Sequence, residues 1–357
     1  MNEMINYCLK LLILLVGLVG KGTVFAQDKQ YQVRTIAFYN CENLFDTLKD
    51  PKNRDEEWTP QGARVWTQKK YQQKLRNLAR VLSQVGREEN PLMPSIIGVA
   101  EVENRQVLED LVQQPSLQRG NYGIVHFDSP DRRGIDVGLL YAKKHFVLLQ
   151  SSKHTLYIYD QRQKSKNKTS KRRIYTRDQL LVSGLLEGEE MHFIVNHWPS
   201  RVGGEKLSSV NREAAAALNR KIIDSLQKIN PQAKIITMGD LNDGPFNTSV
   251  KSIMQTEGDQ SKVQPLGLFN PMDKMAKQGY GTLAYQDQWD IFDQLILTEA
   301  FLGNDYASWR YWKAQIFQKP FMVQSSGQYR GYPLRNTTNE PGFSDHFPVF
   351  LYVIRTW

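Results

Sequence analysis

Cysteine is scarce in this chain of 357 residues, which contains only Cys8 and Cys41. Cys8 lies in an N-terminal segment that we expect to be removed, so a mature chain would keep one cysteine. A single cysteine excludes an internal disulfide, even in an oxidising compartment. The fold must therefore be held together by burial of apolar side chains, and about 330 residues are enough for one large domain or two small ones.

Several motifs that define enzyme classes are also absent. The sequence has no cysteine and histidine cluster with zinc-ligand spacing, no Walker-type glycine loop and no Gly-x-Ser-x-Gly segment. These absences argue against a structural zinc site, a P-loop nucleoside triphosphatase and an α/β-hydrolase esterase.

No apolar run is long enough to span a bilayer, which needs roughly 20 residues. The longest run near the N-terminus covers residues 11–19 and follows Lys10, and Val24-Phe25-Ala26 gives the small-x-small pattern of a signal-peptidase site. We therefore expect residues 1–26 to be a cleavable signal peptide and the mature protein to be secreted or periplasmic, with no stable membrane anchor. An uncleaved N-terminal anchor is the alternative.

Basic residues outnumber acidic ones, with 46 Lys and Arg against 37 Asp and Glu and a net charge of +9. A positive surface attracts polyanions but does not identify one. Lysines and arginines gather at 161–173, where serine, asparagine and threonine separate them. This segment is either a solvated loop or a contact to a phosphate backbone, which clustered basic side chains bind by releasing counterions.

Apolar periodicity predicts three helices and a series of short strands. We expect helices at 67–85, capped by Thr67, around Val107 to Val112, and at 205–229. In the last helix the inward-facing residues would be Val210, Leu218, Ile222 and Leu226. Strands are expected at 95–100, 122–127, 135–142, 179–186, 191–197, 234–238, 291–297 and 347–354. Strands and helices do not alternate regularly, so the order favours a layered α/β or α+β architecture over a simple doubly wound sheet.

Polar side chains fall at or just beyond the ends of predicted strands. They are Asn40, Glu101, His197, Asp240 and Asn242. Ligand sites of layered α/β proteins collect at strand ends, so these side chains are candidates to converge in one cleft. Some also have a purely structural interpretation. Glu101 is compatible with an exposed position at a strand end, and Asp240 to Pro245 consists of residues that favour turns. Together they supply oxygen ligands of the kind that Mg²⁺ prefers.

Six segments, in this order, resemble the endonuclease/exonuclease/phosphatase superfamily. They are Phe38-Tyr39-Asn40-Cys41-Glu42-Asn43, Gly98-Val99-Ala100-Glu101-Val102-Glu103-Asn104, Val195-Asn196-His197-Trp198-Pro199, Gly239-Asp240-Leu241-Asn242, Phe292-Asp293-Gln294-Leu295-Ile296-Leu297 and Ser344-Asp345-His346-Phe347-Pro348-Val349. The resemblance covers nearly the whole mature chain. It implies that residues 27–357 form an α/β (α+β) DNase I-like four-layer sandwich, with two mixed β-sheets packed face to face and flanked by helices.

The resemblance also implies roles for individual residues. Glu101 and Asp345 would bind Mg²⁺, with Mn²⁺ or Ca²⁺ as alternatives, and Asn40 would assist at the metal and the substrate. Asp240 and Asn242 would contact the scissile phosphate and the attacking water or metal.

Further roles fall on histidines and their partners. His346, oriented by Asp293, would act as a general base or stabilise the charge of the phosphorane. His197 would be catalytic, at a position where DNase I-like and phospholipid-cleaving members have a histidine and abasic-site repair enzymes usually do not. Asp136 would be the partner of His197, and Arg177 resembles the phosphate-binding arginine of DNase I, so both are expected at the substrate.

The substrate is a separate question, because fold alone does not select it. Basic charge, the segment 161–173 and the similarity of 239–245 to secreted bacterial nucleases predict a Mg²⁺-dependent endonuclease of DNA, or of RNA, with no protein partner. Trp198, Trp289 and Tyr175 are candidates for stacking on bases. The alternatives are a sphingomyelinase-like enzyme that inserts an aromatic hairpin from 306–332 into lipid, an inositol-phosphate phosphoesterase, and a binding module without catalysis.

Overall fold

Two mixed β-sheets form the centre of the molecule, for which a computed structural model describes residues 30–160 and 172–357. The expected signal peptide at 1–26 and most of the basic segment at 161–173 lie outside the described residues. In the described part of the chain, no helix combines the length and the apolar character that crossing a membrane requires.

The first sheet has six strands. In spatial order they are β16 (Arg310–Ile316), β17 (Val349–Thr356), β1 (Tyr31–Leu44), β2 (Ile96–Val102), β4 (Asp136–Ala142) and β3 (Tyr122–His126). β1 is antiparallel to β17 and parallel to β2, so the sheet is mixed. The central strands β1 and β2 are buried along almost their whole length, as expected for strands that are covered on both faces.

The second sheet has seven strands. In spatial order they are β11 (Thr256–Glu257), β12 (Leu268–Phe269), β15 (Asp293–Thr298), β10 (Ile235–Asp240), β9 (Glu189–His197), β8 (Gln179–Leu186) and β5 (Phe146–His154). β10 is parallel to β9 and antiparallel to β15. Two small hairpins lie outside both sheets, β6 (Ile158–Tyr159) with β7 (Arg173–Ile174) and β13 (Leu283–Tyr285) with β14 (Gln288–Asp290).

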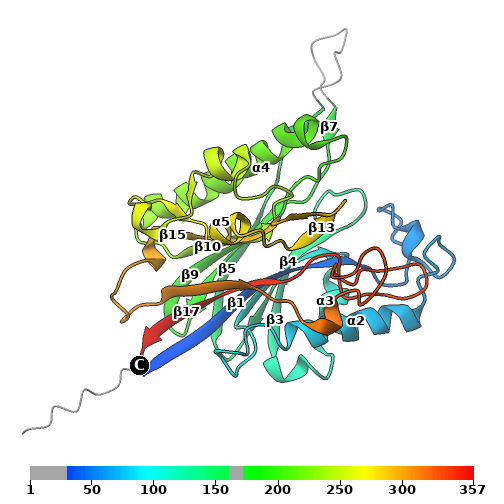
Figure 1. The fold of residues 1–357 in the computed structure, drawn as a ribbon, viewed down its shortest axis with the longest axis horizontal. Coiled ribbons are helices and arrows are strands. Elements are labelled where there is room, and N and C mark those ends of the chain that lie inside the picture. Colours follow the sequence, from blue (N-terminus) through cyan, green and yellow to red (C-terminus); the bar gives the residue numbers. More distant parts are fainter. Residues whose placement is uncertain (1–29, 161–171) are drawn as a thin grey trace, which may run out of the picture.

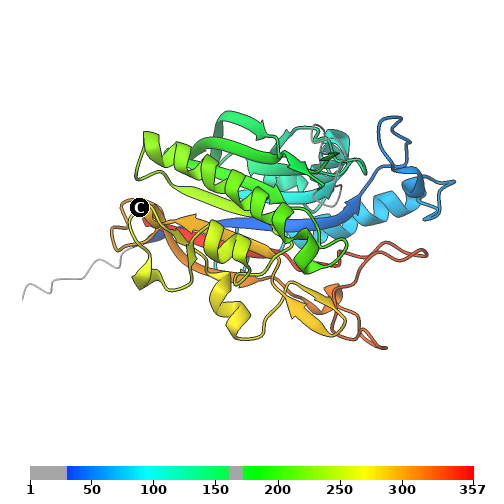
Figure 2. The same ribbon diagram turned by 90° about the horizontal axis from the view of Figure 1, so that it is seen from above.

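Helices cover the outer faces of the two sheets and complete four layers (Figures 1 and 2). α2 (Gln68–Leu82) and α3 (Arg105–Val112) pack on the first sheet, and α4 (Glu205–Ile229) packs on the second. Phe38, Phe193 and Met238 belong to the apolar core between the sheets. The expected fold, two mixed sheets packed face to face and flanked by helices, is confirmed.

The remaining helical segments are short. They are α5 (Met272–Lys277), the 3₁₀ turns Glu56–Trp58, Gln118–Gly120, Gln260–Lys262, Glu299–Phe301 and Pro320–Met322, and a π-helical turn at Ser249–Ile253. The expected cap of α2 is confirmed, because the hydroxyl of Thr67 accepts a hydrogen bond from the backbone N–H of Lys70 at 3.4 Å. The helix ends at Leu82, three residues earlier than expected.

The inner face of α4 differs from the expectation. Val210 is 47% exposed, whereas Arg212 is fully buried. The guanidinium Nε of Arg212 lies 2.7 Å from Oδ1 of Asp243, and its NH1 donates to the hydroxyl of Ser208 at 2.7 Å. A paired arginine therefore takes the inward position, and the prediction that Val210 faces inward is wrong.

The aromatic-rich segment at 306–332 forms part of the core. Its main element is β16, which pairs with β17 at the edge of the first sheet. Trp309 has no exposed surface, Phe317 is 2% exposed, and the ring nitrogen of Trp309 donates to the carbonyl oxygen of Leu186 at 3.2 Å. Side chains buried in this way are not available for insertion into lipid.

Candidate active site

Three polar residues lie side by side across the second sheet. His197 ends β9, Asp240 ends β10, and Asp293 begins β15. In the register of these strands His197 is opposite Asp240, and Asp240 is opposite Asp293. Residues opposite one another on neighbouring strands share one face of the sheet. Strand pairing therefore places two carboxylates beside an imidazole, although the three residues are distant in sequence.

Two polar residues of the first sheet face this row. Asn40 in β1 and Glu101 in β2 each lie where the strand pairing shifts register. The backbone φ of Glu101 is +58°, a conformation that costs roughly 1–3 kcal/mol for residues other than glycine. In this conformation its carboxylate accepts a hydrogen bond from the backbone N–H of Asn43 at 3.0 Å. Its other oxygen lies 3.7 Å from Nε2 of His197.

Short contacts join the side chains of the two sheets. Nδ2 of Asn40 donates a hydrogen bond to Oδ2 of Asp240 at 3.1 Å. Nε2 of His197 lies 3.6 Å from the same oxygen, and Nε2 of His346 lies 3.9 Å from it. Oδ1 of Asp345 is 3.9 Å from Nε2 of His346. These residues, together with Glu101 and Asp293, form one cluster, called the catalytic cluster below.

His346 is held in the cluster from two directions. Its Nδ1 lies 2.7 Å from Oδ2 of Asp293, which has no exposed surface. Its backbone N–H donates to the hydroxyl of Ser344 at 3.0 Å, and that hydroxyl donates to the carbonyl oxygen of Asn40 at 2.7 Å. Nε2 is therefore the ring nitrogen that faces Asp240. Ser344 lies within the segment that carried the resemblance, but no role was assigned to it from the sequence.

The pKa values of the two histidines are displaced in opposite directions. Burial alone would lower the pKa of His346, but nearby carboxylates, Asp293 above all, hold it well above its usual value. Burial and the positive charge of Arg177 hold the pKa of His197 well below its usual value. Burial raises the pKa of Asp240 to about 6, although the neighbouring His346 opposes this shift.

Asn242 lies on the turn after β10 and has a backbone φ of +50°. Its backbone N–H donates to Oδ1 of Asp240 at 2.9 Å, which fixes the orientation of that carboxylate. Its side-chain nitrogen donates to the carbonyl oxygen of Trp198 at 3.0 Å. The residue therefore joins the loops after β9 and β10 beside the cluster.

A family model described as the Endonuclease/Exonuclease/phosphatase family matches residues 35–355. The chain belongs to this family. Among proteins with curated descriptions, none gives a significant match.

Solved structures with the family's fold superpose on most of the chain. TDP2 from D. rerio, complexed with a single strand DNA product, is 14% identical with a TM-score of 0.52, and the match covers 91% of this chain and 100% of that one. An endonuclease/exonuclease/phosphatase family protein from Bacteroides thetaiotaomicron is 14% identical with a TM-score of 0.51, covering 92% and 96%. A mannosyl-6-phosphatase from Bacteroides thetaiotaomicron VPI-5482 is 14% identical with a TM-score of 0.50, covering 90% and 99%. At such identities the superpositions show a common fold and do not select a substrate.

Arg177 has a different set of contacts from the one expected of a phosphate ligand. It is buried, and three of its nitrogens are bonded within the protein. NH1 donates to Asp131 at 3.1 Å, Nε to the carbonyl oxygen of His197 at 3.2 Å, and NH2 to that of Trp198 at 2.6 Å. Arg177 therefore holds the backbone that carries His197.

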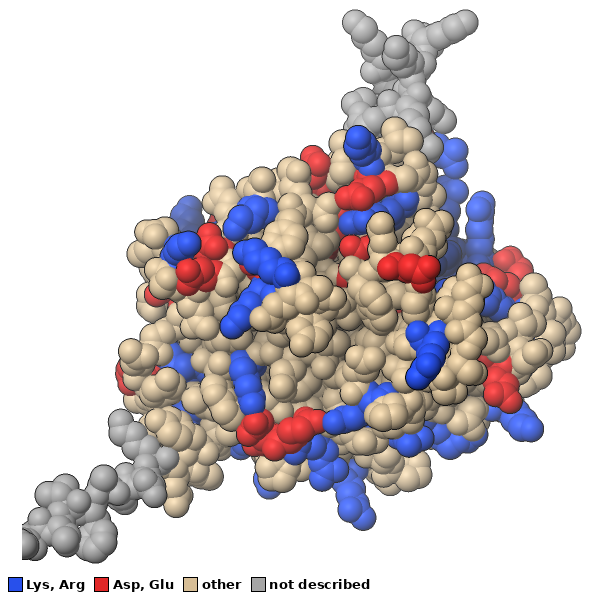
Figure 3. All heavy atoms as spheres, viewed as in Figure 1, with Lys and Arg blue, Asp and Glu red and all other residues tan. Residues whose placement is uncertain are grey.

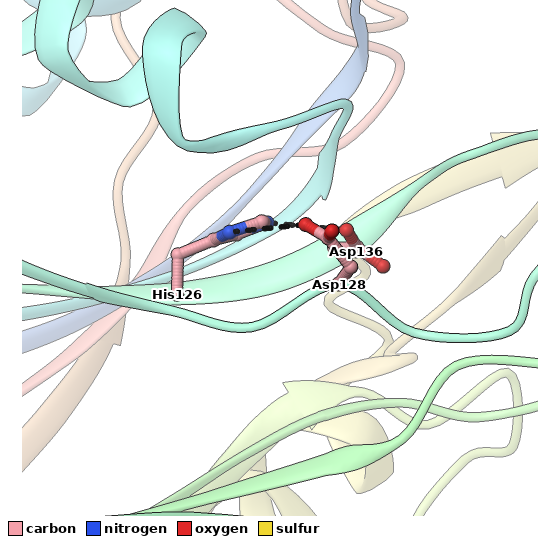
Figure 4. A group of neighbouring side chains, drawn as sticks. All are labelled: His126, Asp128 and Asp136. Atoms are coloured by element: carbon pink, nitrogen blue, oxygen red, sulfur yellow. Dashed lines mark hydrogen bonds and ion pairs between the residues drawn. The ribbon is translucent and has the colours of Figure 1, made fainter. Parts of the chain in front are cut away.

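Asp136 does not pair with His197, so this prediction is wrong. Its carboxylate lies 3.1 Å from Nε2 of His126 and accepts hydrogen bonds from the backbone and hydroxyl of Ser129 at 2.9 and 2.5 Å. Within the described residues, Nδ1 of His197 has no hydrogen-bond partner. Asp136 begins β4, whose neighbours are β2 and β3, so its nearest imidazole comes from β3. Figure 4 shows it with His126 and Asp128, a group at metal-ligand spacing in which His126 contacts both carboxylates.

A divalent cation fits the charge of the catalytic cluster. The cluster holds four carboxylates, those of Glu101, Asp240, Asp293 and Asp345. They are opposed by the imidazole of His346, whose pKa is raised, and by the exposed guanidinium of Arg335, which lies 3.7 Å from Asp345. Mg²⁺ keeps several of its waters and needs one or two carboxylates besides substrate phosphate, so this sparse oxygen set suits it. Glu101 and Asp345 are the residues that would hold such an ion.

A buried ion pair behind the cluster was not anticipated from the sequence. Nζ of Lys74, on α2, lies 3.7 Å from Oε2 of Glu42 and has no exposed surface. It also donates to Oδ1 of Asn336 at 3.2 Å and to the carbonyl oxygen of Phe343 at 3.0 Å. Burial raises the pKa of Glu42 to about 7. The pair ties α2 and the segment before Ser344 to β1, and the only sequence signal was a lysine on the apolar face of a helix.

One of the three aromatic residues expected to stack on bases is unavailable. Trp198 is 1% exposed, and its ring nitrogen donates to Oδ1 of Asn196 at 3.2 Å. Trp289 and Tyr175 are 38% and 41% exposed. They remain candidates for contact with substrate.

Proposed function

We propose that this phosphoesterase is a Mg²⁺-dependent nuclease, with endonucleolytic cleavage of DNA as its principal activity. The observation that carries the proposal is that His197 and His346 approach the same oxygen of Asp240, at 3.6 and 3.9 Å. Phosphodiester hydrolysis needs one proton removed from water and one delivered to the leaving oxygen. Two imidazoles beside one carboxylate supply groups for both transfers.

The metal and the amide of Asn40 would act on the phosphate. Mg²⁺ bound by Glu101 and Asp345 would supply positive charge and an activated water. Asn40 donates to Asp240 through Nδ2, so its amide is already directed into the cluster. An amide donor stabilises a phosphoryl oxygen without adding negative charge.

The remaining residues move or hold protons. His346 exchanges a proton at Nε2, because Asp293 binds Nδ1 and fixes the ring. Asp240, fixed by the backbone N–H of Asn242, orients the attacking water beside the phosphate. His197 presents Nε2 to the same space, and Arg177 keeps its backbone in place.

Three observations support nucleic acid as the substrate. The chain carries a net charge of +9. A recess beside the loop after His197 is lined by Arg132, Arg172 and Arg173, besides the internally bonded Arg177 and one acidic residue, Asp160. The D. rerio TDP2 of similar fold was solved with a single strand DNA product. We further propose that residues 1–26 are removed on export and that the enzyme acts outside the cytoplasm.

A phosphorylated sugar or polyol is the second candidate substrate. A recess of about 330 Å³ borders Asp345 and is lined by Tyr285, Tyr329, Tyr332 and several glutamines. Aromatic faces and amide groups suit the faces and hydroxyls of a sugar. The mannosyl-6-phosphatase of similar fold gives this alternative a precedent.

The test compares substrates under matched conditions. Purified protein is incubated with plasmid DNA, single-stranded DNA, RNA, sugar and inositol phosphates, and sphingomyelin vesicles, each with Mg²⁺ or with EDTA. The matched control is His346→Gln, which removes the proton-exchanging ring. DNA nicking that requires both Mg²⁺ and His346 is the expected result. Release of phosphate from sugar phosphates without DNA cleavage would favour a phosphorylated sugar or polyol as the substrate. Turnover of no substrate would indicate a binding module.

A further inference from the structure

A recess of about 390 Å³ lies beside the catalytic cluster and is lined by arginine and tyrosine side chains. Its walls come from Arg132 in the segment before β4, Asp160 after β6, strand β7, the segment that leads into β8, the loop after β9 and one residue of α4. Pro199 and Arg177 both line it, and Arg177 binds the carbonyl oxygen of His197. The recess is therefore a direct neighbour of the cluster, although the cleavage step itself does not use it.

Arg132, Arg173 and Tyr175 line this recess, and the ring of Tyr157 lies against Arg173. The guanidinium of Arg132 lies 5.2 Å from the centre of the Tyr175 ring. That of Arg173 lies 4.9 Å from the same ring and 4.5 Å from the ring of Tyr157. We call Tyr157, Arg173, Tyr175 and Arg132 the Arg–Tyr ladder. A ring that contacts the face of a guanidinium fixes its plane and leaves the N–H groups at its edge for a ligand.

Hydrogen-bond donors in this recess lack partners. Within the described ranges, Nε of Arg173 and the hydroxyl of Thr176 are buried and have no hydrogen-bond partner. Thr176 lines the recess and is 3% exposed. The carboxylate of Asp131, adjacent to Arg132 in the chain, is bonded to Arg177. Unpaired buried donors cost free energy, so a ligand that brings acceptor oxygens would relieve that cost.

The β6–β7 hairpin, which carries Arg173 of the ladder, is packed against the apolar core. Ile158 of β6 is 3% exposed and belongs to the apolar core shared with α4, and it is opposite Ile174 of β7. Arg173 lies next to Ile174 on the same strand. A binding group held by a packed hairpin loses little freedom when its ligand arrives, which favours affinity. In Figure 3 blue Lys and Arg side chains lie on the surface below the grey segment, with red Asp and Glu side chains among them.

We propose that this recess is a second phosphate-binding site, which holds a nucleic-acid strand at a phosphate away from the one being cleaved. The inference rests on the proposed nuclease function. A nucleic-acid strand with one phosphate in the cluster would continue along the surface, and the loop that follows His197 leads through Pro199 to the recess. Planar guanidinium groups bind phosphate oxygens in pairs, and such contacts position a strand without reading its sequence.

The experiment removes two positive charges from the ladder with Arg132→Gln and Arg173→Gln together. The matched control is Arg87→Gln with Arg119→Gln. These two exposed arginines lie before β2 and β3, and replacing them removes the same charge elsewhere on the surface. Each protein is assayed on a dinucleotide with one phosphodiester bond and on a single strand of about 20 nucleotides, across a range of salt concentrations.

The ladder variant should raise KM for the long strand by roughly tenfold and reduce the slope of log KM against log salt by about 1. Its turnover of the dinucleotide should match wild type, and the control pair should leave the contrast between the two substrates unchanged. Tyr175→Phe should behave as wild type and Tyr175→Ala as the ladder variant, because the ring fixes both guanidinium groups. Equal behaviour of the ladder variant and the control on the long strand would overturn the inference.

The inference and the proposed function fail in different ways. If wild type cleaves neither substrate, the nuclease proposal fails, and binding of the labelled long strand is then measured by fluorescence anisotropy in EDTA. Weaker binding by the ladder variant than by the control supports the phosphate site even in that case. Equal binding, or no binding by wild type, rejects it.

Discussion

Asp293 has one carboxylate oxygen bonded to His346, and its other oxygen has no hydrogen-bond partner among the described residues. A buried carboxylate with so few partners is costly unless an opposite charge compensates it. The imidazole of His346, whose pKa is raised by its carboxylate neighbours, provides that charge. The pair is therefore an electrostatic unit that also holds Nε2 of His346 toward Asp240.

Replacing Asp293 with asparagine should reduce kcat by roughly 100-fold or more with little change in KM, because an amide neither fixes the imidazole tautomer nor stabilises its charge. The exposed Asp305→Asn serves as the control and should retain full activity. Steady-state kinetics on the preferred substrate measures both. Undiminished kcat in the Asp293 variant would show that His346 does not act through this pair.

The residues of the cluster were identifiable from the sequence because each lies near one end of an apolar segment in a recognisable motif. Asn40, Glu101 and Asp240 are examples, and all three are in contact with another member of the cluster. The partners of Asp136 and Arg177 were not identifiable in the same way. Those partners depend on which strand is adjacent and on loop carbonyls, neither of which a single sequence specifies.

At the scale of elements, strand register explains how the site residues come together. Burial of a charged side chain explains why the inner face of α4 was predicted wrongly. The register of β9, β10 and β15 aligns three candidate site residues that the sequence separates widely. In α4 the apolar pattern favoured Val210 as an inward residue, but Arg212 is buried because Asp243 pairs with it. An arginine can be buried only when an acidic side chain pairs with it. Here that side chain belongs to another element, so the apolar periodicity of the helix alone does not reveal the pair.

The Lys74–Glu42 pair gives a prediction about α2. Lys74→Met should destabilise the protein by about 3–5 kcal/mol, because it leaves the buried Glu42 with only the exposed Arg335 as a cationic neighbour. Adding Glu42→Gln should recover most of that loss. Urea unfolding measures each free energy, with the exposed Lys69→Met on the same helix as a control. A double variant as unstable as Lys74→Met alone would show that the pair does not stabilise α2 in the way described.

The segment around β16 gives a second prediction at this scale. Trp309→Ala should cost about 3–5 kcal/mol, since its side chain lies fully inside the core between the sheets. Trp312→Ala, at a residue 40% exposed, should cost far less and should not change association with sphingomyelin vesicles. Thermal unfolding and vesicle sedimentation measure these effects. Vesicle binding that depends on Trp312 would restore the lipid alternative.

At the scale of the whole molecule, the site exists because two sheets present their strand ends to one another. Asn40 and Glu101 come from the first sheet, while His197, Asp240 and Asp293 come from the second. The layered architecture was predictable from the order of apolar segments, since their strand lengths and the flanking helices allow few arrangements. Edge elements such as β5 and β16 were not predicted, because their exposed or aromatic residues lack the regular alternation of a half-buried strand.

The most direct test of the central claim is the response of wild type and Glu101→Gln to Mg²⁺, followed in one titration by DNA cleavage and by the melting temperature. Wild type should gain activity and stability together as Mg²⁺ is added, because a ligand that binds only the folded state stabilises it. Glu101→Gln should lose at least roughly 100-fold in activity and show a much smaller Mg²⁺-dependent rise in Tm. The exposed Glu190→Gln should match wild type in both respects. Full, Mg²⁺-saturable activity in Glu101→Gln would contradict the account, since the ion would then be bound somewhere other than this cluster.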